Sequence, residues 1–155
     1  MNDFVVENKI DVMAFTETWL LPGEADGAVI SDITPTGYVF RRVSRKKRGG
    51  GVAVLRKKSL KGKMNLMKSF KSFEYMDIML ESNSKTLRVV VVYRPPPSRA
   101  NGSTNELFFS EFETFLEQLA AERSQIMVVG DFKFHVDDHN NSSKCYQMFA
   151  VTSDF

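Results

Sequence analysis

Three polar side chains that could take part in chemistry each lie beside an apolar run of the sequence. They are Glu17 in Thr16-Glu-Thr-Trp-Leu, Tyr93 in Val91-Val-Tyr-Arg-Pro-Pro, and Asp131 in Val128-Val-Gly-Asp-Phe. Strand ends are where α/β folds assemble their sites. A carboxylate at the end of a buried strand is costly unless it is paired, hydrogen-bonded or bound to a metal. Glu17 and Asp131 are therefore candidate site residues, although each taken singly is also compatible with an ordinary loop.

The first elements that must position these residues are a short helix and three strands. Residues 2–9 predict the end of a helix that leads into a strand at Val12–Thr16. A loop punctuated by glycine and proline follows from Pro22 to Gly37. Strands are expected at Tyr38–Val43 and Gly51–Lys57, joined by a basic, glycine-rich turn. The triple glycine of that turn resembles a phosphate cradle only loosely, so we favour use in a turn or bulge.

A second hairpin, one long helix and a last strand are expected in the rest of the chain. Phe73–Glu81 alternates apolar and polar positions, and Leu87–Tyr93 is a β-branched run that follows a polar turn. Asn105–Glu122 has apolar residues at helical spacing, and its aromatic stripe predicts core packing. Gln125–Val129 predicts a short buried strand. We expect residues 1–155 to form one domain of the α/β class.

The positive charges are concentrated in one stretch of the chain. Between Ile33 and Phe73 there is no Asp or Glu, yet this stretch holds 13 of the 21 Lys and Arg residues. Such a segment suits a polyanion, because each neutralised phosphate releases counterions. A solvated surface loop explains the same composition. If the polyanion interpretation holds, the residues that bind nucleic acid are expected to be Arg41, Arg42, Arg45, Lys46, Lys47 and Arg48.

Composition also limits the cellular setting. Cys145 is the only cysteine, so the chain can form no internal disulfide and has no paired cysteines for zinc. The longest apolar run, Val89–Tyr93, is too short to span a bilayer, and the first residues do not form a secretion signal. We therefore expect an intracellular protein of the nucleus or cytoplasm, with no membrane contact.

Five ordered blocks of the sequence together carry a family resemblance. They are Asp11-Val-Met-Ala-Phe-Thr-Glu-Thr-Trp-Leu, Gly49-Gly-Gly-Val-Ala-Val, Phe73-Glu-Tyr-Met-Asp-Ile, Val92-Tyr-Arg-Pro-Pro and Met127-Val-Val-Gly-Asp-Phe-Lys-Phe-His-Val-Asp-Asp. In order and spacing they resemble the endonuclease/exonuclease/phosphatase domain of non-LTR retrotransposons, specifically LINE-type elements of the CR1 and Rex kind. The resemblance covers nearly the whole chain.

The resemblance implies a fold and a set of roles. The fold would be part of a four-layer αββα sandwich of the DNase I type, with mainly antiparallel sheets. Glu17 would bind a divalent metal, Mg²⁺ or Mn²⁺, Tyr93 would donate a hydrogen bond to the phosphate, and Asp131 would orient the attacking water. Glu74 would lie near the same site. The partner would be DNA or RNA, and in an intact element a C-terminal reverse transcriptase would follow.

The chain departs from the family's pattern in three places. Lys133 stands where the family has an asparagine two residues after the aspartate, and a lysine only donates and adds a positive charge. The family's metal-binding asparagine on its first strand and its C-terminal Ser-Asp-His motif also have no counterpart. We therefore expect an incomplete domain that is catalytically impaired and prone to self-association. His135 and His139, with the two aspartates between them, are expected to be loop residues more than metal ligands.

Three functions follow as hypotheses. The first is an apurinic-type DNA endonuclease that hydrolyses phosphodiester bonds with magnesium and is impaired in this chain. The second is a noncatalytic remnant that binds nucleic acid through its basic segment. The third is a phosphatase of the same superfamily, which the retrotransposon-like blocks disfavour.

Overall fold

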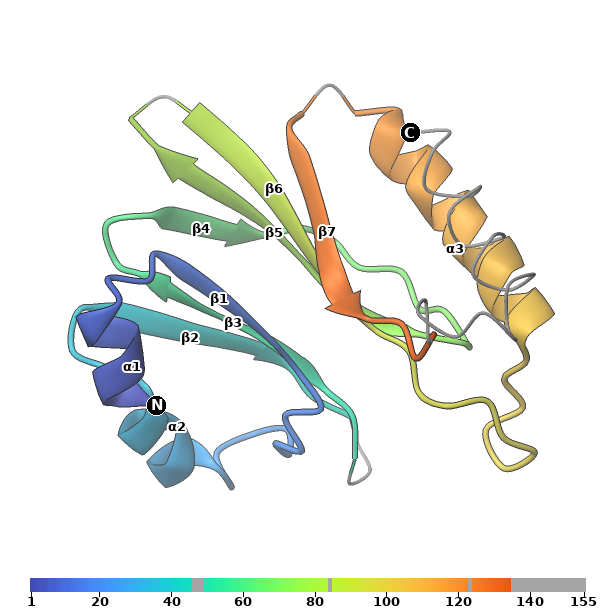
Figure 1. Ribbon diagram of the computed structural model, residues 1–155, viewed down its shortest axis with the longest axis horizontal. Coiled ribbons are helices and arrows are strands. Elements are labelled where there is room, and N and C mark those ends of the chain that lie inside the picture. The colour runs from blue at the N-terminus through green and yellow to red at the C-terminus, as the bar shows by residue number, and fades with distance from the viewer. Residues whose placement is uncertain (46–48, 84, 123, 135–155) are drawn as a thin grey trace. The chain divides into compact units, whose positions relative to one another are not determined.

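The computed structural model describes residues 1–45, 49–83, 85–122 and 124–134 (Figure 1). These residues form two compact units. The first unit contains Met1–Lys68, Glu74–Tyr93 and Ser124–Asp131, and it holds every strand. The second unit contains Ser69–Phe73, together with residues 94–122 and 132–134.

The first unit consists of two short helices and seven strands. In chain order they are α1 (Asn2–Glu7), β1 (Val12–Thr16), α2 (Gly27–Ile33), β2 (Tyr38–Val43), β3 (Val52–Lys57), β4 (Lys61–Met64), β5 (Glu74–Ser82), β6 (Lys85–Tyr93) and β7 (Ile126–Asp131). The strands form a three-stranded sheet with the order β1-β3-β2 and a four-stranded sheet with the order β4-β5-β6-β7. All neighbours are antiparallel except β6 and β7, which are parallel. The expectation of mainly antiparallel sheets is therefore confirmed.

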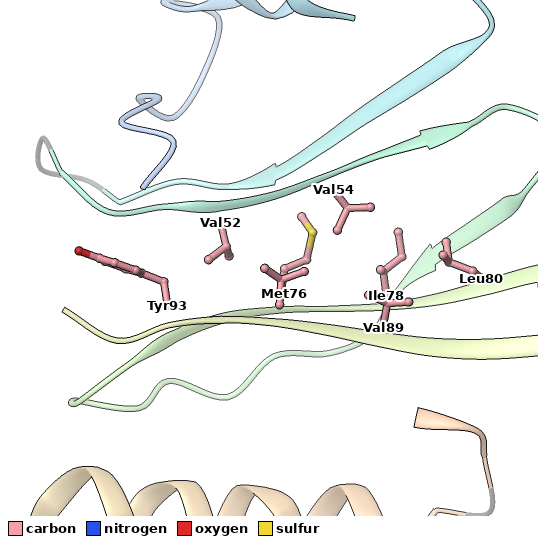
Figure 2. Packing of buried hydrophobic residues seen from close by; sticks show 8 residues of the cluster. Val52, Val54, Met76, Ile78, Leu80, Val89 and Tyr93 are labelled. Atoms are coloured by element: carbon pink, nitrogen blue, oxygen red, sulfur yellow. The ribbon is translucent and has the colours of Figure 1, made fainter. Parts of the chain in front are cut away.

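The two sheets pack face to face around an apolar core. Figure 2 shows Val52 and Val54 of β3 opposite Met76 and Ile78 of β5, with Tyr93 at one end of the cluster. These residues recur at every second position of their strands, because successive side chains point to opposite faces of a sheet. Each fully buried side chain of this size contributes about 1.5–3 kcal/mol to folding. The sandwich is thus held together by the alternating pattern of three strands.

The opposite face of the three-stranded sheet is covered by α1. Val5 of α1 is fully buried and forms a second apolar cluster with Tyr38 of β2 and Leu55 of β3. The Tyr38 hydroxyl donates a hydrogen bond of 2.8 Å to the carbonyl oxygen of Ile10, which fixes the connection between helix and sheet. The helix that the sequence predicts before the first strand is confirmed, and it forms an outer layer of the sandwich.

The second unit is built on α3 (Asn105–Ala120). The Thr104 side chain caps the helix by accepting a hydrogen bond of 3.1 Å from the Leu107 amide. The helix buries Phe108, Phe112 and Phe115 among further aromatic rings, including Phe73 and Phe132. The predicted core role of the aromatic stripe is confirmed.

Arg94 lies fully buried at the centre of this aromatic cluster. Its guanidinium carbon is 4.5 Å from the centre of the Phe108 ring and 4.2 Å from that of Phe134. The guanidinium also donates to the Asn105 side chain and to the Phe132 carbonyl oxygen. Burial lowers the pKa of Arg94 from its ordinary value, with a smaller opposing effect of Glu106. The guanidinium is a cation that lies between the two rings.

Two elements differ from the expectation. The segment from Pro22 to Gly37, expected to be a loop, contains α2, a helix of seven residues with no buried side chain. Its weak amphipathic signal is hidden by the glycines and prolines around it. The strand β4 was also not expected, because Lys61-Gly-Lys-Met has no apolar alternation. It forms as an edge strand through its register with β5, and its lysines protect that edge from pairing with another chain.

A buried ion pair lies on the face of β5 and β6 turned away from the apolar core. Asp77 is 2% exposed and Arg88 is 7% exposed. Arg88 Nε lies 3.0 and 3.1 Å from the two carboxylate oxygens, and Arg88 Nη2 lies 2.6 Å from Oδ2. The Asn65 side chain donates a further hydrogen bond of 2.7 Å to Asp77. The carboxylate therefore has several partners that compensate for its loss of water.

This geometry predicts that removing one partner of the Asp77–Arg88 pair destabilises the fold more than removing both partners. Asp77→Ala leaves a buried guanidinium without its counter-charge and should destabilise the fold by about 3–5 kcal/mol. The double change Asp77→Leu with Arg88→Met removes both charges at similar volume and should cost much less. Urea unfolding measures the free energy of unfolding of the wild type, of Asp77→Ala and of the double variant. Asp77→Asn is a milder variant for the same measurement. Equal stability of Asp77→Ala and the double variant would contradict the prediction.

Candidate active site

Three of the residues expected near a site form one row across the four-stranded sheet. Glu74 begins β5, Tyr93 ends β6 and Asp131 ends β7. Glu74 is the register partner of Tyr93, and Tyr93 is the register partner of Asp131. Partners in register point to the same face of a sheet, and this row continues the alternation of Met76 and Val91. The three polar side chains therefore lie at the end of the sheet face that points into the core.

Glu17 directly follows β1 at the corresponding end of the three-stranded sheet. The last residue of that strand, Thr16, is the register partner of Val52, the first residue of β3. Beyond it, the Thr18 amide donates to the Gly51 carbonyl oxygen at 3.3 Å, and the Trp19 amide donates to the Gly50 carbonyl oxygen at 3.0 Å. Glu17 has a φ of 52° and Trp19 a φ of 57°, which side chains of this size rarely adopt. The chain at Glu17 is thus held against the glycine turn by backbone hydrogen bonds.

The Glu74 carboxylate connects the two sheets at this end of the sandwich. Its Oε2 atom accepts a hydrogen bond of 2.9 Å from the Gly51 amide, and its Oε1 atom forms an ion pair with Nε of Arg45. The Glu74 side chain is 18% exposed and that of Arg45 is 39% exposed. One carboxylate of the four-stranded sheet therefore fixes both sides of the turn between β2 and β3. The sequence places Glu74 near the site but gives no sign of this bridging contact.

Glycine is required on both sides of the site for reasons of space. Gly51 has a φ of 87°, and a Cβ there would lie 2.6 Å from Oγ1 of Thr18. Gly130 has a φ of 158°, and a Cβ there would lie 1.9 Å from the backbone oxygen of Val92. Gly130 therefore allows β7 to approach β6 closely just before Asp131. These positions support the interpretation of the triple glycine as a turn and explain the glycine before the aspartate.

The oxygen donors at this end of the sheets suit magnesium. Magnesium is usually bound through one or two carboxylates together with water and substrate oxygens. Glu17 and Asp131 are the carboxylates expected at the site, and Glu74 contacts Gly51 and Arg45. Within the described residues there is no group of three or more His, Cys, Asp or Glu side chains that could hold a metal by themselves. A metal ion at this end of the sheets would therefore need further ligands from substrate or water. His135, Asp137, Asp138 and His139 lie outside the described residues.

The basic residues expected to bind nucleic acid have different environments. Arg41 is exposed on β2. Arg42 donates to the carbonyl oxygens of Leu21 and Gly23, at 3.0 and 2.6 Å, and so fixes the loop after β1. Arg45 is paired with Glu74. The remaining three, Lys46, Lys47 and Arg48, lie outside the described residues.

Lys133 is exposed and has a φ of 54°. It follows Asp131 by two residues and belongs to the second unit. The left-handed backbone at this position is one that asparagine adopts more readily than lysine. The backbone at this position therefore has a conformation that would suit the expected asparagine better than the lysine present.

The fold and the site together define a class of protein. Two mainly antiparallel sheets packed face to face, with carboxylates and a tyrosine gathered at strand ends, are the DNase I-like sandwich that the sequence predicts. The chain belongs to the Endonuclease/Exonuclease/phosphatase family, whose sequence model matches residues 2–138. No curated protein matches the chain.

Solved structures show the same fold. An AP endonuclease from Archaeoglobus fulgidus has a TM-score of 0.66 at 16% identity, over 99% of this chain and 63% of that one. The 3′ phosphatase NExo from Neisseria, bound to a product DNA hairpin, has a TM-score of 0.63 at 14% identity, over 97% and 63%. TDP2 from D. rerio, in complex with single-strand DNA product, has a TM-score of 0.60 at 12% identity, over 92% and 54%. The chain thus spans between about half and two thirds of the length of these structures. None of the helices in the part of the chain that the structure describes is long and apolar enough to cross a membrane.

The glycine turn gives a prediction about the geometry of the site. Gly51→Ala should destabilise the protein by about 1–3 kcal/mol, because the new Cβ meets Thr18 and the backbone keeps a positive φ. Adding Thr18→Ala should recover the part of this cost that comes from the clash. Gly27→Ala is the control, since its Cβ would meet no atom within 4 Å. Urea unfolding measures all four proteins, and equal effects at positions 51 and 27 would contradict the prediction.

Proposed function

We propose that the chain is a nucleic-acid phosphodiester hydrolase domain of the retrotransposon endonuclease type, with a weakened catalytic site. The observation that carries the proposal is the register of Glu74, Tyr93 and Asp131, which aligns two family residues at one end of the sandwich. Glu17 lies at the same end of the other sheet, which Glu74 connects to the row through Gly51. The similarity in fold to an AP endonuclease and to a DNA-bound 3′ phosphatase supports this class of chemistry.

Each residue of the site has one role in the proposal. Glu17 supplies a carboxylate ligand to Mg²⁺ or Mn²⁺, and the metal, when bound, neutralises charge on the scissile phosphate. The hydroxyl of Tyr93 donates a hydrogen bond to a phosphate oxygen. Asp131 accepts a hydrogen bond from the attacking water and orients it. Glu74 acts through the backbone, because it fixes the turn against which the Glu17 segment is held.

Lys133 explains why the site should be weak. An asparagine at this position both donates and accepts hydrogen bonds, whereas lysine only donates. The ammonium also brings a positive charge within two residues of Asp131, which opposes metal binding and favours an ion pair with that carboxylate. The water that Asp131 orients would then lack a second partner. This substitution therefore contributes to the impaired turnover that we propose, through weaker metal binding and a less well oriented water.

Binding of nucleic acid without catalysis is the second candidate function. The specific observation in its favour is the exposure of Arg41 and of the lysines at positions 58, 61, 63, 68 and 71 in a stretch without acids. Basic residues of this kind bind phosphates without reading sequence. DNA is the first partner to test and RNA the second. A phosphatase, the third candidate, is separated from both by release of inorganic phosphate.

The retrotransposon origin is the finer part of the proposal. It is supported by the five sequence blocks from Asp11 to Asp138, which also suggest a C-terminal reverse transcriptase in the intact element. The single cysteine and the first residues suggest a nuclear or cytoplasmic setting. Reading the coding frame on both sides of the chain tests this part directly. A flanking frame without reverse-transcriptase motifs would contradict it and leave the proposed chemistry intact.

Nicking of supercoiled plasmid with magnesium tests the proposed chemistry. We expect little turnover by the 155-residue chain, at most slightly above a Glu17→Ala, Asp131→Ala control. Metal titration should nevertheless detect Mg²⁺ or Mn²⁺ binding that the control loses. Lys133→Asn should strengthen metal binding more than it raises the rate, because it removes a charge but does not by itself align the water. Strong nicking by the wild type would refute impairment, and equal metal binding by wild type and control would refute the site.

Salt dependence tests the basic segment. If Arg45, Lys46, Lys47 and Arg48 each contact a phosphate, changing all four to serine should reduce the slope of log affinity against log salt by about 3–4. A second variant changes Lys58, Lys61, Lys63 and Lys68 of the same stretch and removes the same charge, so the two slopes compare the turn with the exposed lysines that follow it. Fluorescence anisotropy with labelled DNA at several salt concentrations gives both slopes. An unchanged slope in the first variant would favour the alternative that this turn is a solvated surface loop.

A further inference from the structure

Trp19 is an exposed aromatic side chain beside the candidate active site. It is 60% exposed, and it follows Glu17 by two residues. Its φ of 57° is in the left-handed region, where a bulky residue is a true outlier. The residue thus has both an unfavourable backbone conformation and a large apolar surface in water.

The backbone around Trp19 is held on both sides. Its own amide donates to Gly50 at 3.0 Å, and the preceding amide donates to Gly51 at 3.3 Å. On the other side, the Leu21 amide donates to a carboxylate oxygen of Asp26 at 2.5 Å, and Arg42 donates to the Leu21 carbonyl oxygen at 3.0 Å. The indole is therefore displayed on a segment whose conformation is fixed before any ligand arrives.

This combination is unfavourable for folding alone. A bulky residue in the left-handed region is strained, and such residues persist where the surrounding structure enforces them, often at ligand sites. The exposed position also gives up the stabilisation that burial of the ring would contribute. Single exposed apolar residues are common by themselves. An exposed ring on an enforced backbone next to a candidate metal ligand is a stronger indication of a ligand contact.

We propose that Trp19 stacks on an unpaired DNA base next to the phosphate whose metal ion Glu17 would bind, an inference that rests on the proposed function. Two residues span at most about 7 Å, and successive nucleotides rise about 3.4 Å along a duplex strand, so the ring lies within a few nucleotides of that phosphate. An indole stacks on any base, because every base has a π face. Trp19 therefore selects DNA whose bases are unstacked near the cleavage point, without reading their sequence.

The chain offers a direct signal for this contact, because Trp19 is its only tryptophan. Tryptophan emission, excited where tyrosine does not absorb, is followed while DNA is added, and anisotropy of a labelled oligonucleotide measures binding separately. We expect single-stranded DNA, and a duplex with one unpaired nucleotide, to quench the emission. A fully paired duplex of equal length should quench it less, and polyphosphate, which has charge but no bases, should not quench it.

Two variants separate stacking from simple apolar contact. Trp19→Leu should weaken binding to single-stranded DNA about tenfold or more, while Trp19→Phe should keep most of the affinity. Both should leave binding to the paired duplex nearly unchanged. DNA that binds without quenching, or Leu and Phe variants that bind alike, would refute the stacking role and leave the proposed function standing. Absence of any DNA binding in the anisotropy measurement would refute both.

Discussion

The packing of β3 against β5 and β6 is the interaction on which the rest of the structure depends. Its residues, such as Val54, Met76 and Val91, occupy alternate positions of their strands, so the apolar layer also decides which face every other residue occupies. A shift of β6 by one residue would turn Tyr93 away from the core and out of line with Asp131. The burial of apolar residues therefore also sets the position of the candidate site residues at the end of the sheets.

Much of this fold could be predicted from local sequence patterns. The two hairpins follow from β-branched and alternating runs, and the long helix follows from its aromatic spacing, with ends that differ from the expectation by one or two residues. α2 and β4 could not be predicted in this way. One has no buried face, and the other is a basic edge strand whose conformation comes from its register with β5. Both depend on partners that are distant or weak in the sequence.

The sequence proposes residues for the candidate site, and their roles stay a prediction, but it gives no sign of the contacts between them. Strand ends and family blocks indicate Glu17, Tyr93 and Asp131, and the register aligns the last two directly. The contact of Glu74 with Gly51 and Arg45 could not be predicted, because it joins residues 23 and 29 positions apart through a backbone amide and one side chain. The hydrogen bonds by which Arg42 fixes the loop after β1 could not be predicted either. Composition alone assigns every arginine of the basic stretch the same role.

The close approach of β7 to β6 at Gly130 determines which substitutions this end of the sheet can tolerate. A side chain at this position would meet the Val92 backbone, so nearly every substitution there disturbs pairing and folding together. Substitutions at Asp131 or Lys133 alter side chains and leave that pairing intact. Side chains beside Gly130 can therefore change independently of the fold, whereas the glycine itself cannot.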